Sequence, residues 1–189
     1  GSQMNFALGL AANDWVLCLD SDEFMDEVLQ AAILELKLSL ADDRVAYRIP
    51  RYWRVLGQEV RAIYPVSSPD FPLRLFNRRS VRFNDAPVDD KATGAPQRRI
   101  LSGRLSHDTF FSLHEVFAKL NSYTSRLVTL KEVKPSLLRA FLSPLVAFGK
   151  WYFLRGAWRD GAVGVVTGAY AALYSFLKYF KSWGRKRGI

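Results

Sequence analysis

The pattern of apolar and polar positions predicts alternating helices and strands in the first two thirds of the chain. Residues 3–12 have a helical composition and lead into a short apolar run, Trp15–Leu19, which predicts a buried strand. From about Asp26 to Leu40, apolar residues recur every three or four positions, as on one face of an amphipathic helix. The order of helix, strand and helix favours an α/β fold with a mixed sheet.

Strand and turn patterns follow as far as residue 111. The stretch VAYRIP predicts a strand that ends at Pro50, and RYWRVLGQEVRAIYP predicts a hairpin around Gly57. The stretch FPLRLFNRRSVRF predicts another strand pair, and NDAPVDDKATGAP predicts a loop because it is rich in turn formers. Ser112 followed by Glu115 matches a capping box and predicts the start of a helix.

From Pro135 onward the strand patterns disappear. Two apolar stretches, Leu137–Leu154 and Gly161–Leu177, flank the turn RGAWRDG. The sequence therefore predicts two parts: an α/β domain at residues 1–130 and an apolar helical tail at residues 131–189.

Length and composition fit one ordinary folded domain. The chain has 189 residues, of which 49% are apolar, so it is long enough to bury a substantial core. Its single cysteine, Cys18, lies inside the first strand and is interpreted as core filler. The N-terminus lacks a basic region followed by an apolar core, so no secretory signal is expected and a cytoplasmic compartment is favoured.

The net charge of +9 is concentrated in the tail. Residues 1–130 hold 16 Lys/Arg and 16 Asp/Glu, whereas residues 131–189 hold 11 Lys/Arg and two acids. Such a tail attracts either an anionic membrane or nucleic acid. The nucleic-acid reading is the weaker of the two, because the positive residues flank long apolar runs, and no nucleic-acid partner is expected.

Three acids, Asp20, Asp22 and Glu23, follow the first strand directly. Side chains at positions i and i+2 of a strand point to the same side, so Asp20 and Asp22 are suited to hold a divalent cation together. The alternative is a solvated turn before an acidic helix N-terminus, where Asp and Glu are favoured. The stretch by itself leaves both readings open.

Several stretches in the same order resemble the family-2 glycosyltransferases, in particular the bacterial branch that builds lipopolysaccharide core, including β-1,4-glucosyltransferases. They run along nearly the whole chain: NFALGLAANDWVLCLDSDE, PLRLFNRRSVRF, APVDDKATG, LSHDTFFSLHEVFAKLNSYTS and RGAWRDGAVGVVTGAYAALYSFLKYFKSW. The resemblance implies a GT-A fold, which has a Rossmann-like sheet that binds a nucleotide-sugar donor.

The resemblance also implies site residues and a metal cofactor, Mg²⁺ or Mn²⁺. Carried over to this chain, Asp22 is the direct metal ligand and Asp20 contacts ribose and metal. A hard cation prefers carboxylate oxygens and neutralises the leaving diphosphate, which agrees with this assignment. These enzymes invert the anomeric centre, so a carboxylate must accept the proton of the acceptor hydroxyl.

The resemblance places that base in a Val-His-acid element, which reads Val88-Asp89-Asp90 here. Asp90 matches the acidic position and is the predicted catalytic base. Asp89 stands where the family has His, which puts the local geometry in doubt. The alternative interpretation of this stretch is a turn rich in solvated aspartates.

Two further side chains, Arg74 and His107, are candidates for the site. Arg74 is predicted to contact the donor diphosphate or an acceptor phosphate, because guanidinium forks suit phosphate oxygens. Arginines that alternate along a strand, as Arg74 and Arg78 do, are equally typical of a solvated face. His107 is a candidate for a group beside the metal, although a lone histidine is more often structural.

The front of such a domain is expected to be missing. Only 19 residues precede Asp20, whereas one βαβ unit needs roughly 30 or more residues. The chain is therefore expected to be the acceptor-side, C-terminal portion of a GT-A domain and to be inactive alone.

The sequence thus predicts an inverting, metal-dependent glycosyltransferase that acts on a lipopolysaccharide-core or other lipid-linked glycan acceptor. The alternative is a non-catalytic membrane-surface module derived from a transferase. The tail predicts peripheral or weakly integral attachment to anionic lipid on the cytoplasmic face of the bacterial inner membrane. Gly161–Leu177 lacks charge and forms a marginal span of about 25 Å, and Leu137–Leu154 is typical of an interfacial helix. A buried helical hairpin is the alternative for the tail.

Overall fold

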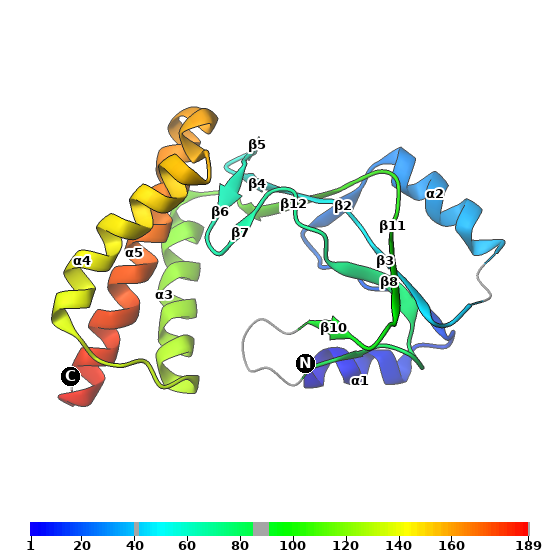
Figure 1. Ribbon diagram of the computed structural model, residues 1–189, viewed down its shortest axis with the longest axis horizontal. Helices are drawn as coiled ribbons and strands as arrows, with labels where there is room; N and C mark the ends of the chain where they lie inside the picture. The colour runs from blue at the N-terminus through cyan, green and yellow to red at the C-terminus, as the bar shows by residue number, and fades with distance from the viewer. Residues whose placement is uncertain (40–41, 85–90, 189) are drawn as a thin grey trace. The chain divides into compact units, whose positions relative to one another are not determined.

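The computed structural model describes residues 1–39, 42–84 and 91–188 and shows a mixed α/β chain that forms two compact units (Figure 1). Unit 1 comprises Gly1–Tyr52 and Asp70–His107, and unit 2 comprises Trp53–Pro69 and Asp108–Ile189. These limits differ from the division at residue 130, because the helix that begins at Leu113 packs with the tail. The functional division into an acceptor-side domain and a membrane-associated tail stays a prediction.

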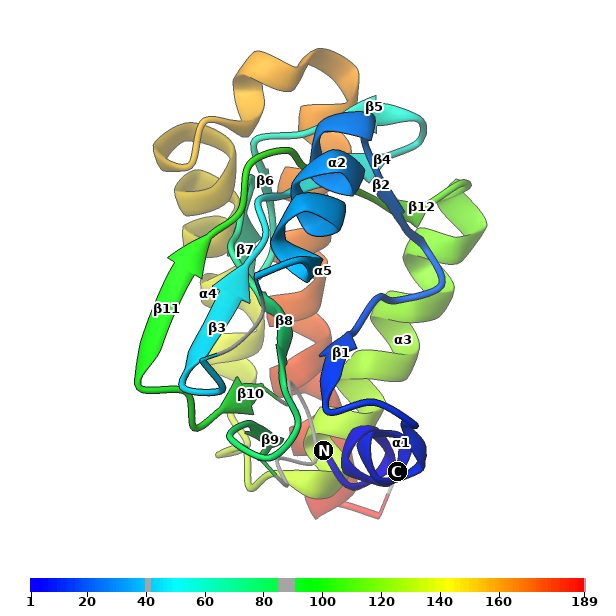
Figure 2. The same cartoon turned by 90° about the vertical axis from the view of Figure 1, so that its right-hand side faces the viewer.

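Unit 1 contains a four-stranded sheet in the order β1-β8-β3-β11, which Figure 2 shows side by side. Strand β8 pairs antiparallel with both β1 and β3, whereas β11 pairs parallel with β3, so the sheet is mixed as predicted. The four strands are β1 (Trp15–Leu17), β3 (Val45–Arg48), β8 (Leu73–Asn77) and β11 (Gln97–Ile100).

A helix packs on each face of this sheet. On one face, Leu8 of α1 (Ser2–Leu10) packs with Ala46 and Phe76. Neighbouring strand positions point the opposite way, where Leu36 of α2 (Glu27–Lys37) packs with Tyr47 and Leu75. Asp26 caps α2 by accepting a hydrogen bond from the Leu29 amide, as the acidic start of the predicted helix indicates. The result is an α/β/α layering, and Rossmann-like GT-A details stay a prediction.

Short strand pairs complete unit 1. Strand β2 (Glu23–Met25) pairs antiparallel with Leu105–His107 of β12, and β9 pairs with β10. The predicted strand pair in residues 71–83 is therefore corrected. Its two strands, β8 and β9, both exist, but each pairs with other strands, because β8 lies between β1 and β3. The remaining bounds are β9 (Arg82–Phe83), β10 (Ala92–Thr93) and β12 (Leu105–Phe110).

Unit 2 begins with the predicted hairpin. Residues Arg54 and Val55 of β4 pair antiparallel with β5, and the two loop residues Leu56 and Gly57 both have positive φ. Such a loop matches the twist of the flanking strands, and glycine adopts it without strain. A second small hairpin follows, in which β6 pairs with β7. The bounds are β4 (Arg51–Val55), β5 (Gln58–Glu59), β6 (Ala62–Ile63) and β7 (Val66–Ser67).

Three long helices form the rest of unit 2, and α5 packs against both α3 and α4 (Figure 1). Ser112 caps α3 as predicted, because its hydroxyl accepts a hydrogen bond from the Glu115 amide. The turn RGAWRDG forms a 3₁₀ helix. The bounds are α3 (Leu113–Leu130), α4 (Leu137–Phe148), the π-helix η1 (Gly149–Leu154), the 3₁₀ helix η2 (Ala157–Asp160) and α5 (Gly161–Lys186).

The core of unit 2 joins the hairpins to the helices. Val55, Val60 and Ile63 pack with Val116 of α3 and Tyr170 of α5. Two glycines of α5 allow this close packing. A Cβ at Gly164 would collide with the Ala157 carbonyl oxygen, and one at Gly168 would press on Phe148 and Tyr152.

The apolar tail has a different arrangement from the one that its sequence favoured. In the part of the chain that the structure describes, one helical segment is long and apolar enough to cross a membrane, and it is Leu137–Leu154. The predicted span, Gly161–Leu177, forms most of α5 instead, and it buries Gly164, Tyr170 and Ala171 among the other elements of unit 2. Both apolar runs pack in unit 2, and α5 lies in the central position because it contacts both α3 and α4.

Candidate functional site

The candidate site lies in unit 1, where the first strand ends beside β8. The amide of Cys18 donates a hydrogen bond to the Arg74 carbonyl, 2.8 Å, so the β1–β8 ladder continues one step beyond β1. The chain then turns, because the Glu23 amide donates to the Asp20 carbonyl. Strand pairing therefore brings Arg74 opposite the acidic turn, 54 positions away in sequence.

Asp20 forms the exposed edge of this cluster. Its Oδ2 lies 2.6 Å from Arg74 Nη2 and 3.7 Å from Arg51 Nη1, and its side chain is 46% exposed. Partial burial by itself raises the pKa of this carboxyl, but the Arg74 charge and hydrogen bond, together with Arg51, outweigh burial and place the pKa below its ordinary value. Asp20 is thus held ionised with one side open to solvent.

Glu23 is the buried centre of the cluster. Its carboxylate has no exposed surface and accepts hydrogen bonds from Arg51 Nη1 at 2.8 Å and from Arg74 Nη2. Its second oxygen accepts from the Asp20 amide at 3.2 Å. A buried charge is tolerated only when it is paired and hydrogen-bonded, and the two guanidiniums meet that requirement.

Arg51 is fixed from its other side by Asp70. Its Nε and Nη2 donate to the two Asp70 oxygens at 3.0 and 2.7 Å, a bidentate pair. The backbones of the same two residues also exchange hydrogen bonds, Arg51 N to Asp70 O at 2.8 Å and Asp70 N to Arg51 O at 3.0 Å. This double pairing holds the Arg51 side chain in one orientation.

His107 links the cluster to Asp22. It sits in β12 directly opposite Glu23, and its Nε2 lies 3.2 Å from Asp22 Oδ2. Burial lowers the pKa of the His107 imidazole, and the Asp22 carboxylate opposes that effect only in part. The ring is therefore mainly neutral near pH 7, and a neutral Nε2–H orients the Asp22 carboxylate by hydrogen bonding.

The structure thus brings together three of the four predicted site residues: Asp20, Asp22 and Arg74. The fourth, Asp90, lies outside the described residues, as do Val88 and Asp89. The sequence reading did not assign Glu23, Arg51 or Asp70 to the site. Glu23 carried a signal, since it adjoins Asp22, whereas Arg51 and Asp70 become neighbours only through a backbone bridge between segments that are separate in sequence.

The cluster is suited to a metal only together with further ligands. Among the described residues, no three or more His, Cys, Asp or Glu side chains are grouped so as to hold a metal ion. Mg²⁺ is commonly bound through one or two carboxylates plus substrate phosphates, and Asp20 and Asp22 provide two partly exposed carboxylates. Four carboxylates against two guanidiniums also leave a negative excess, which attracts a cation.

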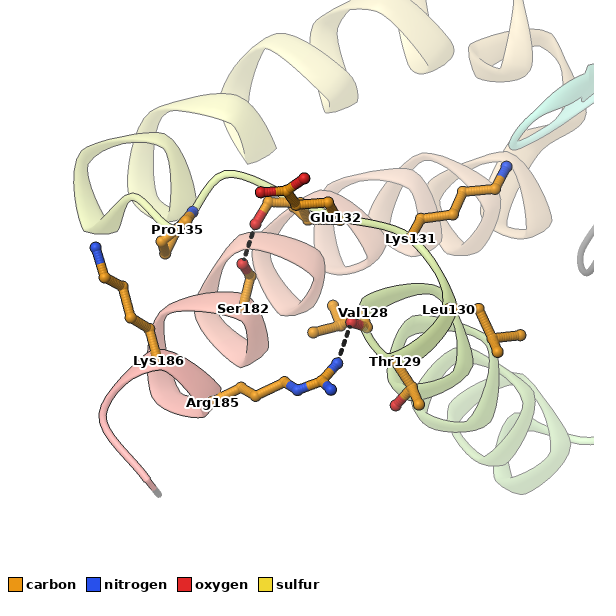
Figure 3. A pocket seen from close by; sticks show the side chains of 10 residues that line it. Val128, Thr129, Leu130, Lys131, Glu132, Pro135, Ser182, Arg185 and Lys186 are labelled. Carbon is orange, nitrogen blue, oxygen red and sulfur yellow. Dashed lines mark hydrogen bonds between the residues drawn. The ribbon is translucent and has the colours of Figure 1, made fainter.

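A separate pocket of about 580 Å³ lies in unit 2, where α3 and α5 end (Figure 3). Arg185 closes one side by donating to the Val128 carbonyl at 2.7 Å, and Ser182 donates to the Val133 carbonyl. Its described lining residues include none of the predicted site residues. They are Val128, Thr129, Leu130, Lys131, Glu132, Val133, Pro135, Ser182, Arg185 and Lys186.

Comparisons with known proteins associate this chain with glycosyltransferases. No family model matches it. It is 26% identical over 193 residues to the lipopolysaccharide core biosynthesis glycosyltransferase LpsC of Rhizobium meliloti. This match covers 97% of the present chain and 68% of LpsC. It is 28% identical over 193 residues to two uncharacterised glycosyltransferases, from Rickettsia prowazekii and Rickettsia typhi, across 95% of this chain and 65% of each relative. The chain spans about two thirds of the length of these curated relatives, and their names support a glycosyltransferase family for it.

Proposed function

We propose that the gene product carrying this chain is an inverting, metal-dependent glycosyltransferase of the family-2, GT-A type. It transfers a sugar from a nucleotide-sugar donor to a lipopolysaccharide-core or other lipid-linked glycan acceptor. The similarity to named glycosyltransferases over nearly the whole chain supports the reaction class. The observation that carries the mechanism is the pair Asp20 and Asp22, two partly exposed carboxylates held in the turn after β1 by Arg74 and His107.

In this proposal Asp22 is the direct metal ligand and Asp20 contacts both metal and ribose. Mg²⁺ or Mn²⁺, when bound, neutralises negative charge on the leaving diphosphate. His107 orients the Asp22 carboxylate, and Glu23 keeps both guanidiniums in place from the buried side. The Arg74 side chain is only 8% exposed and its Nη2 pairs with Asp20 and Glu23, so Arg74 acts here by holding Asp20 in place, and its contact with a phosphate stays a prediction.

Asp90 is proposed as the catalytic base. The acceptor hydroxyl oxygen attacks the anomeric carbon, its proton passes to the Asp90 carboxylate, and the bond from that carbon to the diphosphate oxygen breaks. Direct displacement of this kind inverts the anomeric configuration. The proposal for Asp90 rests on the match of Val88-Asp89-Asp90 to the family element.

The proposed location is the cytoplasmic face of the bacterial inner membrane, with anionic lipid as a partner. The apolar segment Leu137–Leu154 and the relative named for lipopolysaccharide core biosynthesis support this location. An acceptor that is anchored in lipid requires an enzyme that works at the membrane surface.

Metal binding tests the site without requiring turnover. Calorimetric titration of residues 1–189 with Mn²⁺ and inorganic pyrophosphate should give a binding signal that Asp22→Asn weakens at least about tenfold, as expected for loss of a charged ligand. Asp42→Asn is the matched control, since Asp42 is an exposed aspartate of unit 1 that pairs only locally with Arg44 among the described residues. Equal binding by wild type and Asp22→Asn would contradict the metal assignment.

Turnover tests the reaction class itself. The purified gene product should release nucleoside diphosphate from one nucleotide sugar in a panel only when a lipopolysaccharide-core acceptor is present, and EDTA should abolish the release. Persistent turnover in EDTA would refute metal dependence. Membrane binding with no turnover on any donor would instead favour the non-catalytic membrane-surface module.

A further inference from the structure

The segment Leu137–Leu154, formed by α4 and η1, is apolar on two opposite faces. The inner face packs on α5: Ala140 is fully buried, Phe148 approaches Gly168, and the rings of Phe141 and Phe176 are 5.9 Å apart. Trp151 of η1 is buried with Ala62 and Ala171. This inner face explains why the segment folds onto the rest of unit 2.

The outer face is largely exposed to solvent in the described part of unit 2. Four large apolar side chains recur there at helical spacing, and each is between 53% and 71% exposed: Leu138, Leu142, Leu145 and Val146. Phe153 and Leu154 extend the exposed stripe to the end of η1. A helix that is apolar all round is normally buried in a core or in lipid, so this outer face needs a cover.

The charges around the outer face are almost all positive. Arg139 and Lys150 lie within the segment, and both are exposed. Arg155, directly after it, is directed elsewhere, since it donates to the Ser67 hydroxyl and lies over the Trp151 ring. Within residues 131–188, the acids are Glu132 and Asp160, and Asp160 is buried against Arg61. A second copy of this chain would therefore bring like charges together across an isologous contact, whereas an anionic lipid surface complements them.

We propose that the outer face of α4 and η1 binds an anionic bilayer and that this segment lies in the plane of the membrane interface. The apolar stripe enters the boundary between headgroups and acyl chains, and Arg139 and Lys150 contact lipid phosphates. This inference rests on the proposed membrane location and deepens it by naming the surface and the mode of binding.

Packing within unit 2 argues against a transmembrane position. The segment is about 27 Å long at 1.5 Å per residue, which is shorter than a bilayer core of about 30 Å, and Arg139 and Lys150 lie within it. Its inner face is attached to α5, and Lys181 of α5 donates hydrogen bonds to Asn121 and Ser125 of α3. If the segment crossed the membrane together with its neighbours, the polar side chains of Asn121 and Ser125 would enter the lipid. If it crossed alone, its inner face would have to separate from α5.

Flotation with vesicles tests the surface. The chain 1–189 should float with vesicles that contain phosphatidylglycerol and remain at the bottom with pure phosphatidylcholine. Leu145→Glu combined with Val146→Glu should reduce the floated fraction about tenfold, because charges on the inserted face oppose insertion. Both residues are 71% exposed, so the fold should persist, as circular dichroism will show. Leu34→Glu is the matched control, a 65% exposed leucine on α2 in unit 1, and it should float like the wild type.

Each contrary result overturns the proposal. Unchanged flotation of the double variant would show that another surface binds lipid. Equal flotation with neutral vesicles would refute the role of the positive charges. A wild-type dimer by light scattering that the double variant converts to monomer, without any flotation, would identify a second copy as the occupant. None of these readouts requires sugar transfer, so failure here is separable from failure of the proposed reaction.

Labelling distinguishes an in-plane segment from a spanning one. In a Cys18→Ser background, single cysteines introduced as Lys134→Cys and Arg155→Cys mark the two ends of the segment, and both positions are exposed. With vesicle-bound protein, an impermeant maleimide added outside should label both positions equally. Protection of one end alone would mean that the segment crosses the bilayer and would overturn the in-plane arrangement.

Discussion

Arg74 Nη2 donates a hydrogen bond to Asp20 Oδ2 at 2.6 Å, and the same nitrogen contacts the buried carboxylate of Glu23. One guanidinium therefore joins an exposed acid of the proposed metal site to an acid with no exposed surface. This relationship makes the stability of unit 1 and the geometry of the site depend on the same few charges. Among these residues, replacement of Glu23 should lower the free energy of unfolding most.

Glu23→Gln should destabilise the chain by about 3 kcal/mol, because it removes one partner of a buried charge network and leaves Arg51 and Arg74 partly uncompensated. Urea unfolding monitored by circular dichroism measures the difference. Glu35→Gln, at an exposed position on α2, should change the free energy of unfolding by less than about 0.5 kcal/mol. Equal effects of the two substitutions would show that the network does not stabilise the fold.

Asp90→Asn should lower sugar transfer by the gene product by roughly 10²–10⁴, because the amide is nearly isosteric but cannot accept the hydroxyl proton. Donor affinity should hardly change, so kcat falls while the donor KM stays. The adjacent Asp89→Asn is the matched control. If Asp89→Asn is the damaging change and Asp90→Asn the mild one, the base is Asp89.

Gly164→Ala should destabilise unit 2 by about 1–3 kcal/mol or more, because the added methyl group meets the Ala157 carbonyl oxygen and forces η2 away from α5. Gly149→Ala serves as the control, since nothing lies within 4 Å of a Cβ built at that helical position. There, alanine should be neutral or stabilising by up to about 1 kcal/mol. Thermal unfolding of both variants compares them, and a stable Gly164→Ala protein would contradict the observed packing of η2.

Tyr174 should introduce an alkaline limit to the stability of unit 2. Burial, with a smaller effect of Tyr64, raises the pKa of the Tyr174 phenol from 10.0 to about 12. Because the pKa is higher in the folded state, the stabilising contribution is complete below about pH 10 and is lost as the pH rises through about 12. Tyr174→Phe should therefore lose stability less steeply across this range and should lack one late tyrosinate transition at 295 nm. An unchanged absorbance titration would refute the assignment.

Local sequence patterns were sufficient for much of the secondary structure. The helix capped by Asp26, the helix capped by Ser112 and the hairpin at Gly57 follow from short-range hydrogen bonding and backbone preferences, and all three are present. The first strand was also readable from its apolar run, but it ends at Leu17 rather than at Leu19, so Asp20 and Asp22 lie in the turn after the strand and not in strand positions. These features depend on residues within a few positions of one another.

Contacts between distant residues were not readable in this way. Arg74 reaches the acidic turn because β8 pairs with β1, and His107 reaches Asp22 because β12 pairs with β2. Asp70 reaches Arg51 through an isolated backbone bridge. The burial of Glu23, close to the partly exposed Asp20 and Asp22, depends on which side of the turn faces Arg51. Pairing register decides such proximities, and no local pattern encodes it.

The tail shows most clearly the difference between what local sequence predicts and what tertiary packing decides. Both Leu137–Leu154 and Gly161–Leu177 are apolar. Composition therefore indicates that each segment must be covered, but it does not indicate whether protein or lipid covers it. In the folded unit, α5 takes the central place because Gly164 and Gly168 let neighbouring segments approach closely. The helix α4 can then bury only one of its two apolar faces. Which run lies inside is determined by the fit of side chains between helices, a property of the assembled unit rather than of either segment.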